Sequence, residues 1–210
     1  MTASMSKLHS RIYLVSQSPH HRDSLKQIGI GFELLLLRNS LRREIDVDES
    51  ARTGEAPSEY LERICRAKVE AGQHALLSRG LRAFPVLAAE SVVTLDSRII
   101  GKPLDKKESA AILREMSGRQ HQLISAVAVA FQGRVELRLA TTTVTFATLD
   151  EERIGRYVIA NEGHDKIGAY AIGGLGGAFV ERIEGSHSAL TGLPLFETVE
   201  LLRAFGLPVP

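Results

Sequence analysis

Residues 11–19 read RIYLVSQSP, an apolar run followed at once by a polar, hydroxyl-rich turn. The run predicts a buried strand, and Ser18 followed by Pro19 is typical of the N-cap and the first position of a helix. This order of strand, turn and helix is the repeating unit of α/β folds. Because a helix N-terminus presents free backbone N–H groups, the turn is also a candidate anion site.

The rest of the chain alternates in the same way between short apolar runs and helical periodicity. Further strands are expected over 32–37, 86–95, 99–100, 121–131, 135–146 and 178–183, and helices over 19–28, 57–71, 106–116, 151–160 and 195–205. The polar residues 38–53 are expected to form a mobile surface loop. No repeat or linker interrupts the pattern, so we predict a single mixed α/β domain over 1–210, with residues 1–10 flexible.

The composition argues against several classes of protein. A formal net charge of +1 over 210 residues and the lack of tryptophan argue against a broad basic field or an aromatic platform for nucleic acid. Cys65 is the single cysteine, so no disulfide framework is expected and a reducing cytoplasm is the expected location. No run approaches the roughly 18 apolar residues of a membrane span, and residues 1–10 lack the apolar core of a secretory signal.

Glu90 interrupts the apolar run over 86–95. A lone buried carboxylate is unfavourable, so it needs a cation, a metal ion or a proton. Small neighbours leave room for a ligand to approach, which favours a site residue over a structural ion pair. Further candidate carboxylates, for which a solvated acidic loop is the alternative, are Asp46, Asp48 and Glu49.

Three lysines beside turns are candidate phosphate ligands, although each alone is also compatible with a surface lysine: Lys68, Lys102 and Lys166. The polar turn adds further candidates, for which the alternative is a capping serine followed by solvated side chains: Ser16, Ser18, His20, His21 and Arg22. The glycine-rich segment 173–177 resembles a phosphate cradle but lacks the Walker lysine and hydroxyl. We therefore interpret it as a close-packed loop.

Several short motifs follow one another along the chain: SQSP at 16–19, DE at 48–49, AK at 67–68, ESVV at 90–93, GKP at 101–103, SG at 117–118 with His121, DKIGAY at 165–170 and GLPL at 192–195. In these motifs the chain resembles the Maf proteins, which are nucleoside triphosphate pyrophosphatases, over about residues 11–206. It is most similar to the branch that hydrolyses dTTP and UTP, judged by the motif at 165–170 and by GSHSA at 185–189.

The resemblance implies an α/β, ITPase-like fold in which helices flank a mixed twisted sheet and two lobes surround a deep cleft, usually as a homodimer. It also implies that a (deoxy)nucleoside triphosphate is hydrolysed to the monophosphate and pyrophosphate with a divalent cation, Mg²⁺ or Mn²⁺. The implied role is the removal of unwanted nucleotides. No nucleic acid or membrane partner is expected.

The resemblance also assigns roles by motif. The implied ligands of the phosphate chain are Ser16, Ser18, Lys68 and Lys102. Glu49 and Glu90 hold the metal ion, and Glu90 stands in the place of the carboxylate that activates water. These roles suit the chemistry, because cations stabilise charge on the phosphoryl oxygens while a carboxylate takes a proton from the attacking water.

The chain departs from the family's motifs where substrate is expected to bind. His20 and His21 replace two arginines, Glu90-Ser91 stands where Asp-Thr is usual, and Gly173 replaces a glutamine that helps to read the base. The expected substrate-binding set is Ser16, Ser18, His20, His21, Arg22, Ser91, Lys166 and Gly173. These changes motivate an alternative function: a catalytically impaired Maf paralogue acting as a nucleotide-binding or cell-division (septum) regulatory protein.

Overall fold

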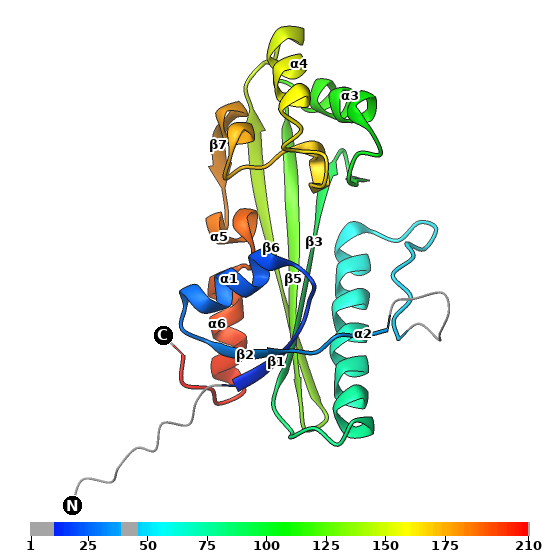
Figure 1. The fold of residues 1–210 in the computed structure, drawn as a ribbon, viewed down its shortest axis with the longest axis vertical. Helices are drawn as coiled ribbons and strands as arrows, with labels where there is room; N and C mark the ends of the chain where they lie inside the picture. The colour runs from blue at the N-terminus through cyan, green and yellow to red at the C-terminus, as the bar shows by residue number, and fades with distance from the viewer. Residues whose placement is uncertain (1–10, 39–45, 210) are drawn as a thin grey trace, which may run out of the picture.

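The computed structural model describes residues 11–38 and 46–209 (Figure 1), so the expected flexible segment 1–10 and part of the expected loop 38–53 lie outside it. The described strands form one seven-stranded sheet in the order β2-β1-β3-β5-β6-β7, with β4 paired to β3. Strand β1 is parallel to β2 and β3, and the other pairs are antiparallel. The expected mixed α/β fold is confirmed, whereas the two lobes around a deep cleft stay a prediction.

The strands are β1 (Arg11–Val15), β2 (Gly31–Leu34), β3 (Val86–Leu95), β4 (Arg98–Ile100), β5 (Gln120–Phe131), β6 (Arg134–Phe146) and β7 (Val180–Glu184). The α-helices are α1 (Pro19–Gln27), α2 (Pro57–Ser78), α3 (Lys106–Met116), α4 (Glu151–Ala160), α5 (His187–Thr191) and α6 (Leu195–Ala204). Two 3₁₀ turns, η1 (Ile167–Ala169) and η2 (Leu175–Phe179), precede β7. Helix α5 and both 3₁₀ turns were not expected from the sequence.

Two expected elements were wrong by three or more residues at their C-terminal ends. Helix α2 continues through Gly72 instead of ending before it, because this glycine lets the helix approach the sheet: a Cβ there would lie 2.7 Å from Val86 Cγ1. The strand expected over 32–37 ends at Leu34. After it the chain leaves the sheet edge toward the C-terminal end of α2, where Arg79 Nη2 donates to Leu36 O at 3.0 Å.

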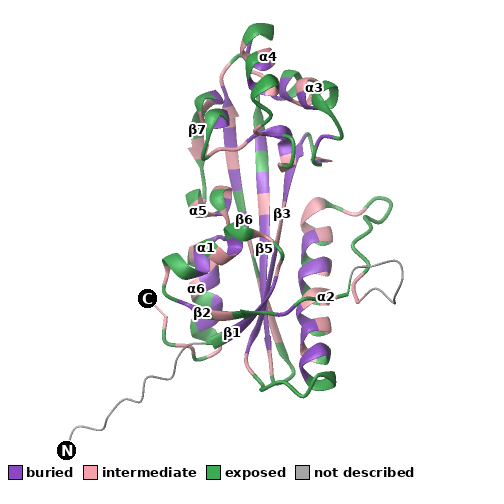
Figure 2. Ribbon diagram, viewed as in Figure 1, coloured by how far each residue is buried: buried purple, intermediate pink, exposed green. Residues whose placement is uncertain are grey.

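Helices cover both faces of the sheet (Figures 1 and 2). Helix α2 packs on one face against a core that includes Tyr13, Val15, Val86, Ala88, Val92, Ala126 and Ala128. On the other face, α1 and α6 pack against a core that includes Ile12, Leu14, Leu87, Ala89, Val127 and Val129. Successive side chains of a strand point to opposite faces of the sheet, so neighbouring residues of one strand belong to different cores. Both faces of β3 are therefore buried.

The far end of the sheet carries α3 and α4 (Figure 1) around a third core that contains the aromatic rings of Phe146, Tyr157, Tyr170 and Phe179. The turn between β5 and β6 is at Gln132-Gly133, as expected, and both residues have positive φ, as a tight two-residue hairpin requires. Among the described residues, no helix has both the length and the apolar character needed to span a membrane.

The fold places Glu90 at the middle of β3, on the face that α2 covers. Side chains two residues away on either side, Ala88 and Val92, belong to the core under α2. Close approach of the helix is visible at Cys65, whose Sγ lies 3.5 Å from Ala126 O. One helical turn further along α2, Lys68 reaches Glu90, so the strand carboxylate meets a cation from the covering helix.

Candidate active site

A cavity of about 390 Å³ lies between the β1–α1 turn, helix α2 and the segment after β2. Its lining residues are Val15, Ser16, Gln17, Ser18, His21, Leu35, Leu36, Leu37, Arg38, Val47, Glu49, Lys68, Glu90 and Lys102. The structure therefore brings together these expected site residues: Ser16, Ser18, His21, Glu49, Lys68, Glu90 and Lys102. They come from five separate parts of the chain, which supports a single site.

Lys68 is the centre of the charged part of this cavity. Its Nζ lies 2.9 Å from Glu49 Oε1 and 2.5 Å from Glu90 Oε1. Burial alone would lower the pKa of Lys68, but the two carboxylates outweigh it and raise that pKa. The ammonium group is therefore charged at neutral pH and holds both carboxylates.

At Glu90 the effect of burial on the pKa outweighs the effect of the neighbouring Lys68 charge. Burial raises the pKa of its carboxyl group, the charge of Lys68 lowers it, Glu49 adds to the rise, and the net result is a raised pKa. A carboxylate with a raised pKa is a stronger base than an exposed glutamate. Glu90 is thus suited to take a proton inside the cavity.

The β1–α1 turn is held by Ser16. Its Oγ accepts from the Ser18 backbone N–H at 3.1 Å and lies 2.8 Å from His21 Nδ1. Burial, together with the charges of His20 and Lys68, lowers the pKa of His21 to about 4. Ser18 occupies the N-cap position, but its side chain makes no capping hydrogen bond. The turn therefore presents a helix N-terminus to the cavity beside a neutral imidazole.

The first turns of α2 position Glu49 through its backbone. Tyr60 Oη donates to Glu49 O at 3.1 Å, and Arg63 donates to Asp48 O and Ser50 O at 3.4 and 2.9 Å. Arg63 is in turn held by Glu55, with Nε 2.6 Å from Oε1. This role of Tyr60 and Arg63 was not predicted from the sequence, although their spacing of three residues places them on one helix face.

Other expected substrate ligands do not line this cavity. His20 is exposed on α1, and Arg22 is half-buried outside the lining. Ser91 lies on the face of β3 opposite Glu90, where its Oγ is 2.7 Å from Ser125 Oγ. Lys166 pairs with Asp165 at 3.1 Å, and Gly173 is exposed in the glycine-rich segment.

The carboxylate of Glu162 accepts hydrogen bonds from backbone N–H groups of the glycine-rich segment. Glu162 Oε1 accepts from the Leu175 N–H at 3.0 Å, and Oε2 accepts from the Gly176 N–H at 3.1 Å. A Cβ on Gly174 would lie 1.9 Å from Glu162 Oε1. The interpretation of this segment as a close-packed loop is confirmed, because its donors bind Glu162.

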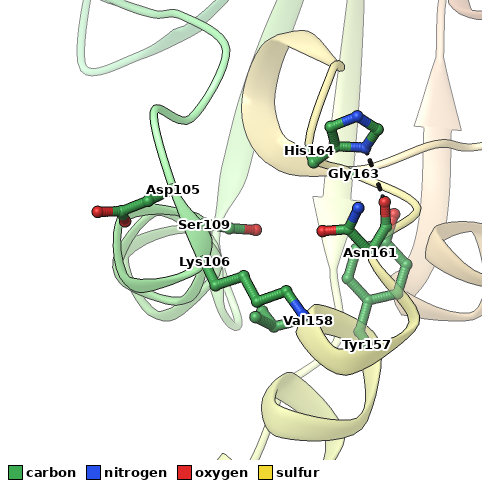
Figure 3. Close-up of a pocket in the computed structure, with 8 residues that line it drawn as sticks. All are labelled: Asp105, Lys106, Ser109, Tyr157, Val158, Asn161, Gly163 and His164. Carbon is green, nitrogen blue, oxygen red and sulfur yellow. Dashed lines mark hydrogen bonds between the residues drawn. The ribbon is translucent and has the colours of Figure 1, made fainter.

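A second cavity lies between the N-terminal end of α3 and the C-terminal end of α4 (Figure 3). It measures about 10 Å³, close to the least volume that holds one water molecule. Beside it His164 Nδ1 lies 2.9 Å from Asn161 O. The cavity is far too small for a nucleotide and is lined by none of the expected site residues.

The larger cavity has donors suited to a divalent cation. No group of three or more His, Cys, Asp or Glu side chains gathers as a metal site in residues 11–38 and 46–209. Glu49 and Glu90 nevertheless converge on one positive charge, the Lys68 ammonium group. Carboxylate oxygens suit Mg²⁺ and Mn²⁺, and Mg²⁺ is commonly held by one or two carboxylates with substrate phosphates and water.

Comparison with known proteins finds several to which this chain is similar. A protein named dTTP/UTP pyrophosphatase from Nitrosomonas europaea is 48% identical over 198 residues, covering 94% of this chain and 96% of that protein. Another of that name from Aromatoleum aromaticum is 44% identical over 206 residues, covering 98% and 100%. A solved structure of the Staphylococcus aureus Ham1 protein is 16% identical, covers 65% of this chain and 72% of that chain, and gives a TM-score of 0.42. The family model described as Maf-like protein matches residues 11–205, and the chain belongs to the Maf family.

Proposed function

We propose that this chain is a metal-dependent nucleoside triphosphate pyrophosphatase with dTTP and UTP as substrates. The observation that carries the proposal is the meeting of Glu49, Lys68 and Glu90 in one cavity of about 390 Å³. That volume is within the range of small-molecule sites. The names of relatives that match nearly the whole chain support the choice of substrate.

In the proposed reaction a water molecule attacks the α-phosphorus. The bond from this phosphorus to the oxygen that bridges the α- and β-phosphates breaks, so the monophosphate forms and pyrophosphate leaves. Glu90 takes the proton of the attacking water, a role supported by its burial and raised pKa. Lys68 and Lys102 stabilise the negative charge on the phosphate oxygens.

The β1–α1 turn is the proposed binding place for part of the phosphate chain. Ser16 and Ser18 line the cavity at the N-terminus of α1, where backbone N–H groups and the helix dipole favour an anion. Glu49 and Glu90 would hold the divalent cation, with substrate phosphates and water as its remaining ligands. When bound, the cation supplies Lewis-acid stabilisation of charge on the phosphoryl oxygens.

The wider organisation of the protein is part of the same proposal. We propose a single domain over residues 1–210, of which the family resemblance covers about 11–206, and the one sheet that extends from β2 to β7 supports it. A homodimer follows from the family resemblance alone. A cytoplasmic location is supported by the single cysteine, Cys65, which is buried.

Pyrophosphate release from a panel of nucleotides tests the proposed function. The purified protein should release pyrophosphate from dTTP and UTP with Mg²⁺ or Mn²⁺, and chelation of the metal should stop the release. Restored release on adding the metal back would separate metal dependence from loss of the fold. Nucleotide binding without turnover under any of these conditions would overturn the proposal and support the nucleotide-binding regulatory alternative.

A further inference from the structure

The buried side of helix α1 brings an imidazole against the β1–α1 turn. His21, Ser24 and Leu25 are the buried residues of this helix, and their spacing of three and four places them on one helix face. The Leu193 backbone N–H donates to Ser24 Oγ at 3.3 Å, and Leu25 belongs to the core between α1 and the sheet. The packing of α1 therefore holds the His21 side chain in place before a ligand binds.

The hydroxyl group of Ser16 has few hydrogen-bonding positions, and two of them are in use. A serine hydroxyl donates one hydrogen bond and accepts two. Ser16 Oγ accepts from the Ser18 backbone N–H at 3.1 Å and lies 2.8 Å from His21 Nδ1. Whether the hydroxyl proton is free for a ligand in the cavity therefore depends on which ring nitrogen of His21 carries a proton.

The two neutral tautomers of His21 leave different groups on Ser16. If Nδ1 lacks a proton, it accepts the Ser16 hydroxyl proton, and only a lone pair of Oγ remains to face the cavity. If Nδ1 carries the proton, it donates to Oγ, and the hydroxyl proton is free to be donated elsewhere. Because phosphate oxygens are acceptors, only the second arrangement suits a triphosphate.

The surroundings of His21 keep its imidazole neutral, so only one of its two nitrogens carries a proton. The residue is 8% exposed, and burial, together with the charges of His20 and Lys68, lowers its pKa to about 4. A ring N–H that donates to Ser16 Oγ also polarises the hydroxyl group, which strengthens the hydrogen bond that this hydroxyl donates in turn. A neutral imidazole can thus support an anion through the serine without adding a charge to the cavity.

We propose that His21, with its proton on Nδ1, is a positioning residue that directs the Ser16 hydroxyl proton toward the phosphate chain of the substrate. Ser16 is half-buried and lines the cavity, so its hydroxyl group can reach a ligand there. The proposal gives His21 a role that acts through Ser16, beyond the direct substrate binding expected from the sequence. This inference rests on the proposed function.

The tautomer is measured by ¹⁵N NMR of histidine-labelled protein bound to a non-hydrolysable α,β-methylene analogue of UTP. With the analogue bound, His21 Nδ1 should give the signal of a protonated ring nitrogen and Nε2 that of an unprotonated one. Comparison with His21→Asn assigns the signals, because that variant lacks only this imidazole. An unprotonated Nδ1 in the complex would overturn the proposal.

Calorimetric binding of the same analogue measures the coupling between the two side chains. Ser16→Ala should raise the Kd about tenfold, because a hydrogen bond to a charged group is lost, and His21→Leu about five- to tenfold. The double variant should bind less than about twofold more weakly than Ser16→Ala, since His21 acts through Ser16. Losses that multiply in the double variant would show that His21 acts independently of Ser16, against the proposal.

A rescue variant and a control separate positioning from packing. His21→Asn places an amide NH₂ near the position of Nδ1 and should recover most of the affinity that His21→Leu loses. In the control, His121→Leu, the replaced histidine is also buried and lies 2.9 Å from a hydroxyl group, Tyr170 Oη, but it does not line the cavity. This variant should have a lower thermal midpoint and a Kd within about twofold of the wild type. Equal losses of affinity in His121→Leu and His21→Leu would assign the effect to stability and overturn the role of His21.

The outcomes distinguish this inference from the proposed function. A wild type that binds no triphosphate overturns the proposed function, and the role of His21 with it. A wild type that binds the analogue, beside a folded His21→Leu variant that binds it equally well, overturns the role of His21 alone. The NMR signal is read from the wild-type chain, so it decides the question even where His21→Leu is unstable.

Discussion

Lys68 Nζ lies 2.5 Å from Glu90 Oε1, so a helix ammonium group meets the one carboxylate of the central strand β3. Glu49 approaches the same nitrogen at 2.9 Å. Removing one member of a buried ion pair leaves the other charge without compensation, whereas here Lys68 has a second carboxylate partner. Glu90 can therefore be changed without leaving the lysine unpaired.

Replacing Glu90 separates its chemistry from its role in binding. Glu90→Gln should lower kcat at least about a hundredfold, because the proposed general base is lost, while the Kd of a non-hydrolysable analogue rises much less, because Glu49 and the phosphates still hold the proposed cation. Glu90→Asp should retain or raise activity. Glu70→Gln, on the exposed face of α2, is the control and should behave as the wild type. Equal pyrophosphate release by the wild type and Glu90→Gln would refute the assignment.

Much of the fold follows from local pattern. Strand β3 and helices α3 and α4 have the bounds that their apolar periodicity predicts, and the turn at Gln132-Gly133 needs only local backbone chemistry. The end of α2 could not be predicted in this way. Glycine is a local signal for the end of a helix, but Gly72 lies inside α2, where its lack of a side chain allows close contact with Val86. Such a contact depends on tertiary packing.

Some residues of the candidate site could likewise be predicted from the sequence, and others could not. Motifs identified Glu90 and Lys68, but the lining of the cavity by Leu36 and Leu37 depends on how the segment after β2 packs beside α2, which no local pattern encodes. Ser91 is different, because the period of two along a strand already places it on the face opposite Glu90. Its hydrogen bond to Ser125 agrees with that placement.

The two histidines at the start of α1 should respond differently to replacement by arginine. His21 lines the cavity and is neutral, so His21→Arg adds a permanent charge there and should lower the Kd of the triphosphate analogue about five- to tenfold. His20 is exposed and outside the lining, so His20→Arg should change the Kd less than about twofold, since solvent and salt screen it. Titration calorimetry measures both, and equal tightening would contradict the placement of His21.

Two neighbouring glycines test the loop that Glu162 holds. Gly174→Ala should lower the free energy of unfolding by about 1–2 kcal/mol, because the new Cβ displaces the carboxylate that accepts from Leu175 and Gly176. Gly173→Ala is the matched control. Nothing lies within 4 Å of a Cβ at Gly173, so its effect should stay within about 0.5 kcal/mol. Urea denaturation compares the two, and similar values for both would argue against the role of Glu162.

His121 joins the aromatic core at the far end of the sheet. Its Nε2 lies 2.9 Å from Tyr170 Oη, and its ring meets Phe146 edge-on at 4.8 Å between centroids. Its Nδ1 has no hydrogen-bond partner among the described residues. Burial lowers the pKa of His121 to about 4, so the folded protein holds this imidazole neutral.

That lowered pKa predicts how stability depends on pH. Because the unfolded chain binds a proton near the ordinary pKa of histidine, about 6.5, and the folded chain does not, the stabilisation is complete above about 6.5 and is lost as the pH falls toward about 4. His121→Gln should remove about 2–3 kcal/mol of the fall in unfolding free energy between about pH 7 and about pH 4.5, whereas the exposed His74→Gln should not. Parallel urea-unfolding curves of wild type and His121→Gln across this range would show that His121 is not the group that takes up the proton.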